Sequence, residues 1–155
     1  MSNEELMRVA IEAAVENVKN GGGPFGAVIA KKGEIVSVGV NRVTAINDPT
    51  AHAEVSAIRA ACAELGTFDL SGCEIFTSCE PCPMCLGAIY WAHLDKIYYG
   101  CSKKDAADAG FDDSMIYDEL ALPMEGRMKP VEKLLSDEAM SSFDAWREAE
   151  DRVEY

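Results

Sequence analysis

Apolar residues recur along the chain with two different periods, and each period predicts a different kind of element. Between residues 3 and 19 they recur every three or four positions, which predicts an amphipathic helix that ends at Gly21-Gly22-Gly23-Pro24. Two short apolar stretches follow, over residues 25–30 and 35–40, and they predict strands. The segment between them, Lys31-Lys32-Gly33-Glu34, is typical of a hairpin turn.

A second helix is predicted from the Asn47-Asp48-Pro49 segment to Gly66. Asp48 suits the N-cap position and Pro49 the first helical position, while Gly66 is a typical helix stop. The pattern beyond it predicts, in chain order, a strand over 74–77, a mostly buried helix over 83–92, a strand over 96–99, a short helix over 114–120, a strand over 130–135 and a helix over 136–150.

The order of the main elements is helix, strand, strand, helix, strand, helix, strand, and it predicts one α/β domain over residues 1–155. We expect a three-layer α/β/α sandwich with a mixed central sheet, because a turn joins the first two strands and helices join the last ones. Ligand sites in such open sheets lie beyond the carboxyl ends of strands. Both chemically rich segments, 48–54 and 78–85, fall at strand-to-helix junctions, which predicts a shared site.

The charge balance is strongly acidic, with 14 lysine and arginine residues against 27 aspartate and glutamate residues and a formal net charge of −13. Proteins that bind nucleic acids need a basic surface to displace phosphate counterions, and no cluster of lysine or arginine occurs in this sequence. We therefore expect no nucleic acid partner. A small neutral substrate is compatible with the charge.

The sequence also carries no sign of membrane insertion or export. Nothing resembles a membrane span, and residues 1–8 are acidic where a signal peptide would be basic. We therefore expect no membrane partner and a cytoplasmic location. Six cysteines in a reducing compartment are not typical of a disulfide framework, so metal binding or catalysis is the expected use of some of them.

Three of the cysteines lie in the stretch SCEPCPMC, residues 78–85. Cys82 and Cys85 are three residues apart at a predicted helix start, so both sulfurs can face one point, and the helix N-terminus favours thiolates. Together with the His52 nitrogen they form a donor set that suits Zn²⁺. Three protein ligands leave a fourth position for water, which is typical of catalytic zinc. Glu54 can serve that water as a proton carrier if His52 lies in the first turn of its helix.

The same residues have other interpretations. Cys79 as a fourth ligand would give a closed structural zinc site, which explains all three cysteines of the stretch and leaves Glu54 without a role. The spacing of Cys79, Cys82 and Cys85 also occurs in redox-active pairs, which need no His-x-Glu partner. A closed zinc site favours a binding module, whereas an open one favours an enzyme.

His52-Ala53-Glu54 together with Pro81-Cys82-Pro83-Met84-Cys85 is the signature of zinc-dependent nucleobase deaminases. The chain resembles the cytidine deaminase superfamily over nearly its whole length, from Gly23 to the last residue, and within it the bacterial guanine deaminases. The narrower likeness rests on the segments NDPTAHAEVSAIRAAC, TSCEPCPMCLGAIYWA, DAADAGFDDSMIY and FDAWREAEDRVEY. The superfamily motif itself is shared with cytosine and tRNA adenosine deaminases.

The resemblance implies hydrolytic deamination of guanine to xanthine and ammonia, with one Zn²⁺ per subunit. It implies His52, Cys82 and Cys85 as the metal ligands and Glu54 as the catalytic acid and base. Asp113 would face the amino-bearing edge of guanine and assist the departing amine. A carboxylate suits that edge because N1–H and the amino group are adjacent donors.

The resemblance also implies a purine pocket and a dimer. Tyr155 would close the pocket of the partner subunit in a homodimer whose swapped segment covers about residues 136–155. The other implied contacts to the purine are Phe25, Asn41, Ala53, Trp91 and Asp113.

Without the resemblance, these pocket residues have plainer explanations. Phe25 and Trp91 are typical core aromatics, Asp112-Asp113 is typical of a solvated turn, Asn41 can end a strand, and Tyr155 can be an unstructured terminus. The alternative functions are deamination of guanosine or another aminopurine, deamination of adenosine in tRNA, and a structural zinc module with three cysteines and one histidine. The acidic charge counts against the tRNA substrate.

Overall fold

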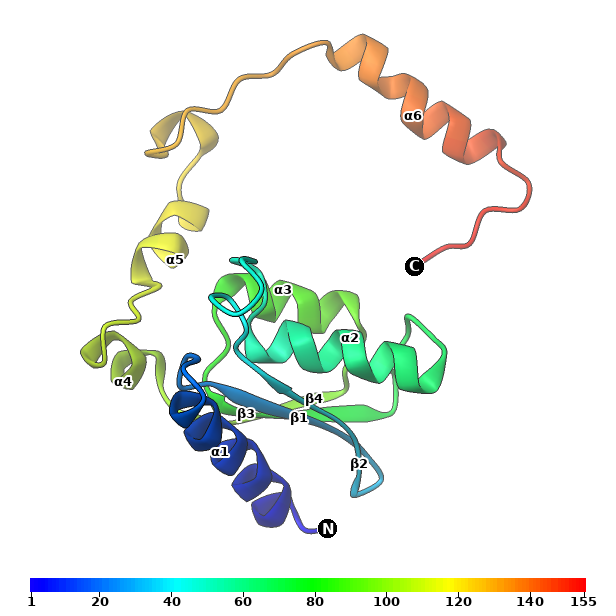
Figure 1. The fold of residues 1–155 in the computed structure, drawn as a ribbon. Coiled ribbons are helices and arrows are strands. Elements are labelled where there is room, and N and C mark those ends of the chain that lie inside the picture. Colours follow the sequence, from blue (N-terminus) through cyan, green and yellow to red (C-terminus); the bar gives the residue numbers. More distant parts are fainter. The chain divides into compact units, whose positions relative to one another are not determined.

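The computed structural model describes residues 1–155, and the chain falls into two compact units, Met1–Ser114 and Met115–Tyr155. The first unit is built on a four-stranded sheet with the order β2-β1-β3-β4. Its strands are β1 (Gly26–Lys31), β2 (Glu34–Val40), β3 (Cys73–Cys79) and β4 (Lys96–Cys101) (Figure 1). The sheet is mixed, as predicted, because β1 runs antiparallel to β2 and β3, whereas β3 and β4 are parallel.

Helices cover both faces of this sheet. α1 (Asn3–Lys19) lies on one face, while α2 (Ala53–Leu65) and α3 (Pro83–Trp91) lie on the other (Figure 1). Side chains of a strand alternate between the faces, so β1 contributes to two cores. On the α1 face the core contains Leu6, Ala10, Val28, Ala30 and Phe76; on the α2 face it contains Ala27, Ile29, Ala57, Ala61, Ile75 and Ile89. The predicted three-layer α/β/α sandwich is confirmed.

The start of α2 lies close against β2 because Gly39 has no side chain. A Cβ atom at Gly39 would collide with backbone atoms of Ala53 and Ala57, which belong to the first turns of α2. Only glycine permits this approach of helix backbone to strand backbone. The contact therefore holds the first residues of α2 over the carboxyl end of β2.

α2 begins later than predicted, at Ala53, with His52 as its N-cap. The Asp48 carboxylate accepts hydrogen bonds from the Thr50 backbone N–H (2.8 Å) and the Thr50 hydroxyl (2.6 Å), so it stabilises a turn before the helix. The prediction of Asp48 as N-cap and Pro49 as the first helical residue is therefore wrong. At the other end the prediction is confirmed, because Gly66 ends α2 in the left-handed conformation.

Two more elements of this unit differ from the predictions. The structure contains α4 (Lys103–Asp108), which the sequence pattern does not predict because six residues are too few to show an apolar period. Its start is stabilised by reciprocal hydrogen bonds between Ser102 and Asp105. α3 is not mostly buried, since Cys85 and Ile89 are its only buried residues. One side of α3 packs on the sheet, and the other side is exposed.

The Met115–Tyr155 unit contains α5 (Ser114–Ala121), which begins one residue before it, the short 3-10 helix η1 (Met124–Gly126) and α6 (Ser136–Glu148). The predicted strand over residues 130–135 is wrong, because these residues have no strand partner and form an irregular connection. No residue from 115 to 155 is buried. Across the whole chain, no helix combines the length and the apolar character that a membrane crossing requires.

Candidate metal centre and cavity

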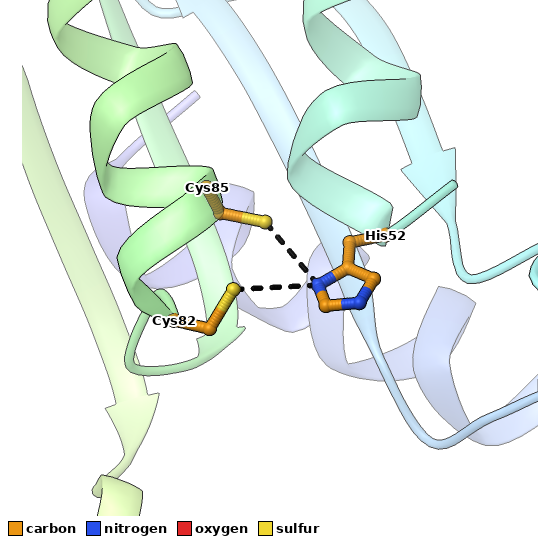
Figure 2. A group of neighbouring side chains, drawn as sticks. All are labelled: His52, Cys82 and Cys85. Carbon is orange, nitrogen blue, oxygen red and sulfur yellow. Dashed lines mark hydrogen bonds between the residues drawn. The ribbon is translucent and has the colours of Figure 1, made fainter. Parts of the chain in front are cut away.

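The predicted metal ligands lie at the starts of two helices on the same face of the sheet. His52 is the N-cap residue of α2, and Cys82 is the N-cap residue of α3, whose first residue is Pro83. Neither N-cap side chain makes a capping hydrogen bond to its own helix. Cys85, the third residue of α3, directs its sulfur to the same point (Figure 2).

The three side chains are spaced as zinc ligands are. His52 Nδ1 lies 3.5 Å from Cys82 Sγ and 3.4 Å from Cys85 Sγ (Figure 2). Zinc bonds of about 2.3 Å to sulfur and about 2.0 Å to nitrogen, at a tetrahedral angle, place these donors about 3.5 Å apart. Both nitrogen-to-sulfur distances therefore fit zinc, and all three donor atoms lie within 4.8 Å of one another. A group of three donors from the protein is typical of catalytic zinc, whereas structural sites use four.

The two sulfurs differ in acidity. The pKa of Cys82 is lowered to about 4, first because the Cys85 thiol donates a hydrogen bond to it and also because the His52 ring does. The same hydrogen bond, together with burial, raises the pKa of Cys85. The pKa of His52 is raised by its hydrogen bond to Cys82. Zinc binds cysteine as the thiolate, so the lowered pKa of Cys82 suits a metal ligand.

Glu54, the second residue of α2, is buried next to the ligands with 7% of its surface exposed. Burial raises the pKa of its carboxyl group. A carboxyl group with a raised pKa is suited to take up and release protons near neutral pH. Two side chains that are two positions apart within a helix point to different sides of it. His52 is the N-cap and lies before the first helical turn, so this separation does not apply to His52 and Glu54. Both side chains line the same cavity.

Cys79 lies apart from the three ligands, at the end of β3. Its sulfur faces the backbone carbonyl of Ser102 at 3.8 Å, and burial raises its pKa to about 11. The ligand atoms of His52, Cys82 and Cys85 all lie within 4.8 Å of one another, and Cys79 does not belong to this group. All six cysteines are free thiols. The geometry therefore favours the open set of His52, Cys82 and Cys85 over a closed site that includes Cys79.

A cavity of about 550 Å³ adjoins the metal ligands within the Met1–Ser114 unit. Its volume lies in the range typical of small-molecule sites. The cavity brings together predicted site residues from five separate segments of the chain: Phe25, Asn41, His52, Glu54, Cys82 and Asp113. The sequence interpretation of a shared site at the strand ends is thus supported by where these residues lie.

The cavity lining also includes an aromatic pair and a carboxylate. The rings of Phe25 and Phe111 meet edge to face, with centroids 5.0 Å apart and an angle of 86° between the planes. Asp113 is half-buried two residues further on, and burial raises the pKa of its carboxyl group. Sequence reasoning missed Phe111, although its position beside the acidic pair in GFDDS was the available signal.

Ala53 and Trp91 lie outside this cavity. Ala53 is 1% exposed and packs in the core between α2 and the sheet. Trp91, at the end of α3, is 68% exposed, because Cys85 and Ile89 form the buried side of that helix. Neither residue lines this cavity, and their contacts with the purine stay predictions. Tyr155 belongs to the Met115–Tyr155 unit, and its closing role stays a prediction.

Comparison with known protein families shows which family the chain belongs to. Residues 1–101 match the family model of the cytidine and deoxycytidylate deaminase zinc-binding region. The chain belongs to this family of zinc-binding deaminases. The matched range contains His52, Glu54, Cys82 and Cys85, so the cofactor of the family is zinc and the three donors form a site that fits it.

Individual relatives within this family match to different extents. The chain is 52% identical over 156 residues to the guanine deaminase of Bacillus subtilis strain 168, covering 100% of both chains. The X-ray structure of guanine deaminase from Bacillus subtilis superimposes with a TM-score of 0.97 at 52% identity, covering 100% of this chain and 99% of that chain. A tRNA-specific adenosine deaminase of Aquifex aeolicus is 40% identical over 104 residues, which cover 67% of this chain and 69% of its own.

Proposed function

We propose that this protein is a guanine deaminase, which converts guanine and water to xanthine and ammonia. The observation that carries the proposal is the likeness to the Bacillus subtilis guanine deaminase, because it continues through residues 102–155, beyond the end of the family match. That stretch contributes Phe111 and Asp113 to the cavity. The tRNA-specific relative matches only 67% of the chain.

Base recognition is assigned to side chains that line the same cavity as the metal ligands. The Asp113 carboxylate accepts hydrogen bonds from N1–H and from the amino group of guanine, which are adjacent donors. The Asn41 amide donates to the opposite, acceptor-bearing edge of the base. Phe25 and Phe111 supply the apolar surface against which a planar purine packs.

The chemical step is assigned to Glu54 beside the three metal ligands. When bound by His52, Cys82 and Cys85, zinc supplies a Lewis acid that lowers the pKa of water towards about 7. The Glu54 carboxylate accepts a proton from the attacking water and delivers it to ring N3 as C2 is attacked. Glu54 then takes the remaining proton from the hydroxyl group added at C2 and delivers it to the amino nitrogen. The bond from C2 to this nitrogen breaks, ammonia leaves and C2 becomes a carbonyl, while Asp113 holds that edge of the base.

We further propose that the protein acts as a homodimer in which the swapped segment, about residues 136–155, brings Tyr155 to the partner subunit's cavity. The support is the apolar character of the Met115–Tyr155 unit, which buries none of its residues. Its exposed apolar side chains include Met128, Val131, Leu134, Leu135, Phe143 and Trp146. Such a segment needs a second apolar surface to be stable in water.

The net charge of −13 supports a small purine over a nucleic acid as the substrate. A panel of guanine, guanosine, adenine, cytosine and a tRNA anticodon stem tests this directly through ammonia release by the zinc-loaded protein. We expect release from guanine above all others. If only the tRNA stem or only guanosine released ammonia, that molecule and not guanine would be the substrate. If none of the five released ammonia, the assignment as an enzyme would be contradicted. The cytoplasmic location expected from the sequence stays a prediction.

A further inference from the structure

Asn17, near the end of α1, joins two segments that form one wall of the cavity. Its side-chain nitrogen Nδ2 donates to the backbone carbonyl of Gly23 and to the backbone carbonyl of Asn41, both at 2.9 Å. An amide nitrogen has two hydrogens, so these two bonds use its full donor capacity. Both Gly23 and Asn41 line the cavity, whereas Asn17 does not. Asn17 thus ties α1 to the glycine segment and to the end of β2.

Two further hydrogen bonds fix the backbone and the side chain of Asn41. Its backbone N–H donates to the carbonyl of Phe25 at 3.3 Å, and its Oδ1 accepts from the N–H of Val43 at 3.2 Å. With Oδ1 occupied by a donor, the side-chain Nδ2 is left to donate to a molecule in the cavity. Guanine offers O6 and N7 as neighbouring acceptors for such a donor.

The glycines of this wall are required by the same contacts. A Cβ atom at Gly22 would collide with the side-chain amide of Asn17, and one at Gly23 would lie 3.1 Å from Cγ of Asn41. The missing side chains at these two positions allow Asn17 to reach Asn41 and allow the segment to pack on the Asn41 amide. The wall is therefore built around the two asparagines.

We infer that Asn17 is a positioning residue for base recognition, which holds Asn41 so that Nδ2 of Asn41 meets the acceptor edge of the purine. The inference rests on the proposed function and adds a residue that does not touch the substrate. A donor held by surrounding hydrogen bonds loses less conformational freedom on binding, so its contact contributes more to affinity. The carbonyls that Asn17 contacts lie outside α1, so its side chain is not needed to complete that helix.

A double-mutant cycle of Asn17→Ala and Asn41→Ala tests the inference. We expect Asn17→Ala to raise the KM for guanine about tenfold, the loss associated with one or two hydrogen bonds, while kcat stays within about threefold. In the Asn41→Ala background the same change should raise KM less than about twofold, because the residue through which Asn17 acts is gone. Equal effects in both backgrounds would overturn the inference.

Two further variants separate positioning from folding. Asn20→Ala changes an exposed asparagine at the same helix end and should leave KM, kcat and the thermal midpoint unchanged. Gly22→Ala keeps Asn17 but displaces its amide, so it should raise KM in the wild-type background and have no added effect in the Asn17→Ala background. A fall in zinc content and thermal midpoint with KM unchanged would show a purely structural role.

Wild-type turnover is measured first, because the inference rests on the proposed function. No turnover of guanine by the wild type would contradict both the proposed function and the role of Asn17. Turnover of guanine with the same KM in the wild type and in Asn17→Ala would contradict the role of Asn17 alone. The two failures are therefore distinguishable.

Discussion

His52 and Cys82 occupy the same position in their respective helices, because each is the residue directly before the first helical residue. At this position a side chain points past the helix end, towards the unpaired backbone N–H groups of the first turn. The positive end of each helix dipole favours a thiolate and a carboxylate nearby. The two helix starts thus favour the anionic forms of Cys82 and Cys85, which bind a cation, and of Glu54, which accepts a proton.

The position of Cys79 predicts that only two of the three cysteines in the stretch hold zinc. Cys79→Ser should keep about one zinc per chain, since its sulfur faces the Ser102 carbonyl and not the other ligands. Cys82→Ser should lose most of the zinc, because replacing a ligand removes a large share of the binding free energy. Atomic absorption on protein purified without added metal measures both. Loss of zinc from Cys79→Ser would contradict the three-ligand site.

Asp113 is predicted to recognise the donor edge of guanine. Asp113→Asn should lower kcat/KM for guanine by about 100-fold, because an amide cannot accept both hydrogen bonds and each bond to a charged group is worth about 1.5–3 kcal/mol. The matched control is Asp108→Asn, an exposed carboxylate on α4 that pairs with Lys104 and does not line the cavity. Steady-state kinetics on both variants would contradict the role of Asp113 if they retained the same kcat/KM.

At the scale of elements, long periodic segments were predictable and local turn chemistry was not. The apolar period and the glycine stop define α1 (Asn3–Lys19) and the end of α2. The predicted start of α2 was wrong because the Asp48 carboxylate stabilises a turn with Thr50. An aspartate can either cap a helix or stabilise such a turn, and the sequence alone does not distinguish the two. A short polar helix such as α4 carries no period at all. Likewise, the apolar residues 130–135 resemble a strand, although the sheet provides no partner for them.

The candidate site shows a similar division. His52, Glu54, Cys82 and Cys85 were predictable because metal and proton-transfer chemistry requires particular residue types at particular spacings. The residues that line the cavity come from separate segments of the chain, so no short sequence motif predicts them. Phe111 was missed for this reason. The positions of Ala53 in the core and Trp91 outside the cavity follow from the packing of their helices.

The contact of α2 with β2 at Gly39 is predicted to be a determinant of stability. Gly39→Ala should lower the free energy of unfolding by at least about 1–3 kcal/mol, because the added methyl group collides with the helix backbone. Gly87→Ala in α3 is the matched control, since a Cβ there meets no atom within 4 Å. Alanine should stabilise that helix by about 0.4–1 kcal/mol. Urea denaturation measures both, and equal stabilities would contradict the close approach.

At the scale of the whole molecule, the proposed exchange of C-terminal segments predicts complementation between two inactive variants. Glu54→Gln subunits lack the proton carrier, and subunits without residues 152–155 lack Tyr155. In a mixed dimer the shortened subunit keeps an intact Glu54 and receives Tyr155 from its partner. Equal coexpression should therefore restore about a quarter of wild-type activity, from half the dimers with one complete site each. The absence of any gain over the separate variants would contradict the exchange.

An open zinc site in which Glu54 transfers protons is the centre of the proposed mechanism. Zinc content and xanthine formation, measured on the same samples of wild type and Glu54→Gln, test this most directly, with Glu64→Gln on the exposed side of α2 as the control. We expect about one zinc per chain in all three proteins and xanthine formation lowered by about 10²–10⁴-fold in Glu54→Gln only. Full activity in Glu54→Gln, or zinc without xanthine in the wild type, would contradict it.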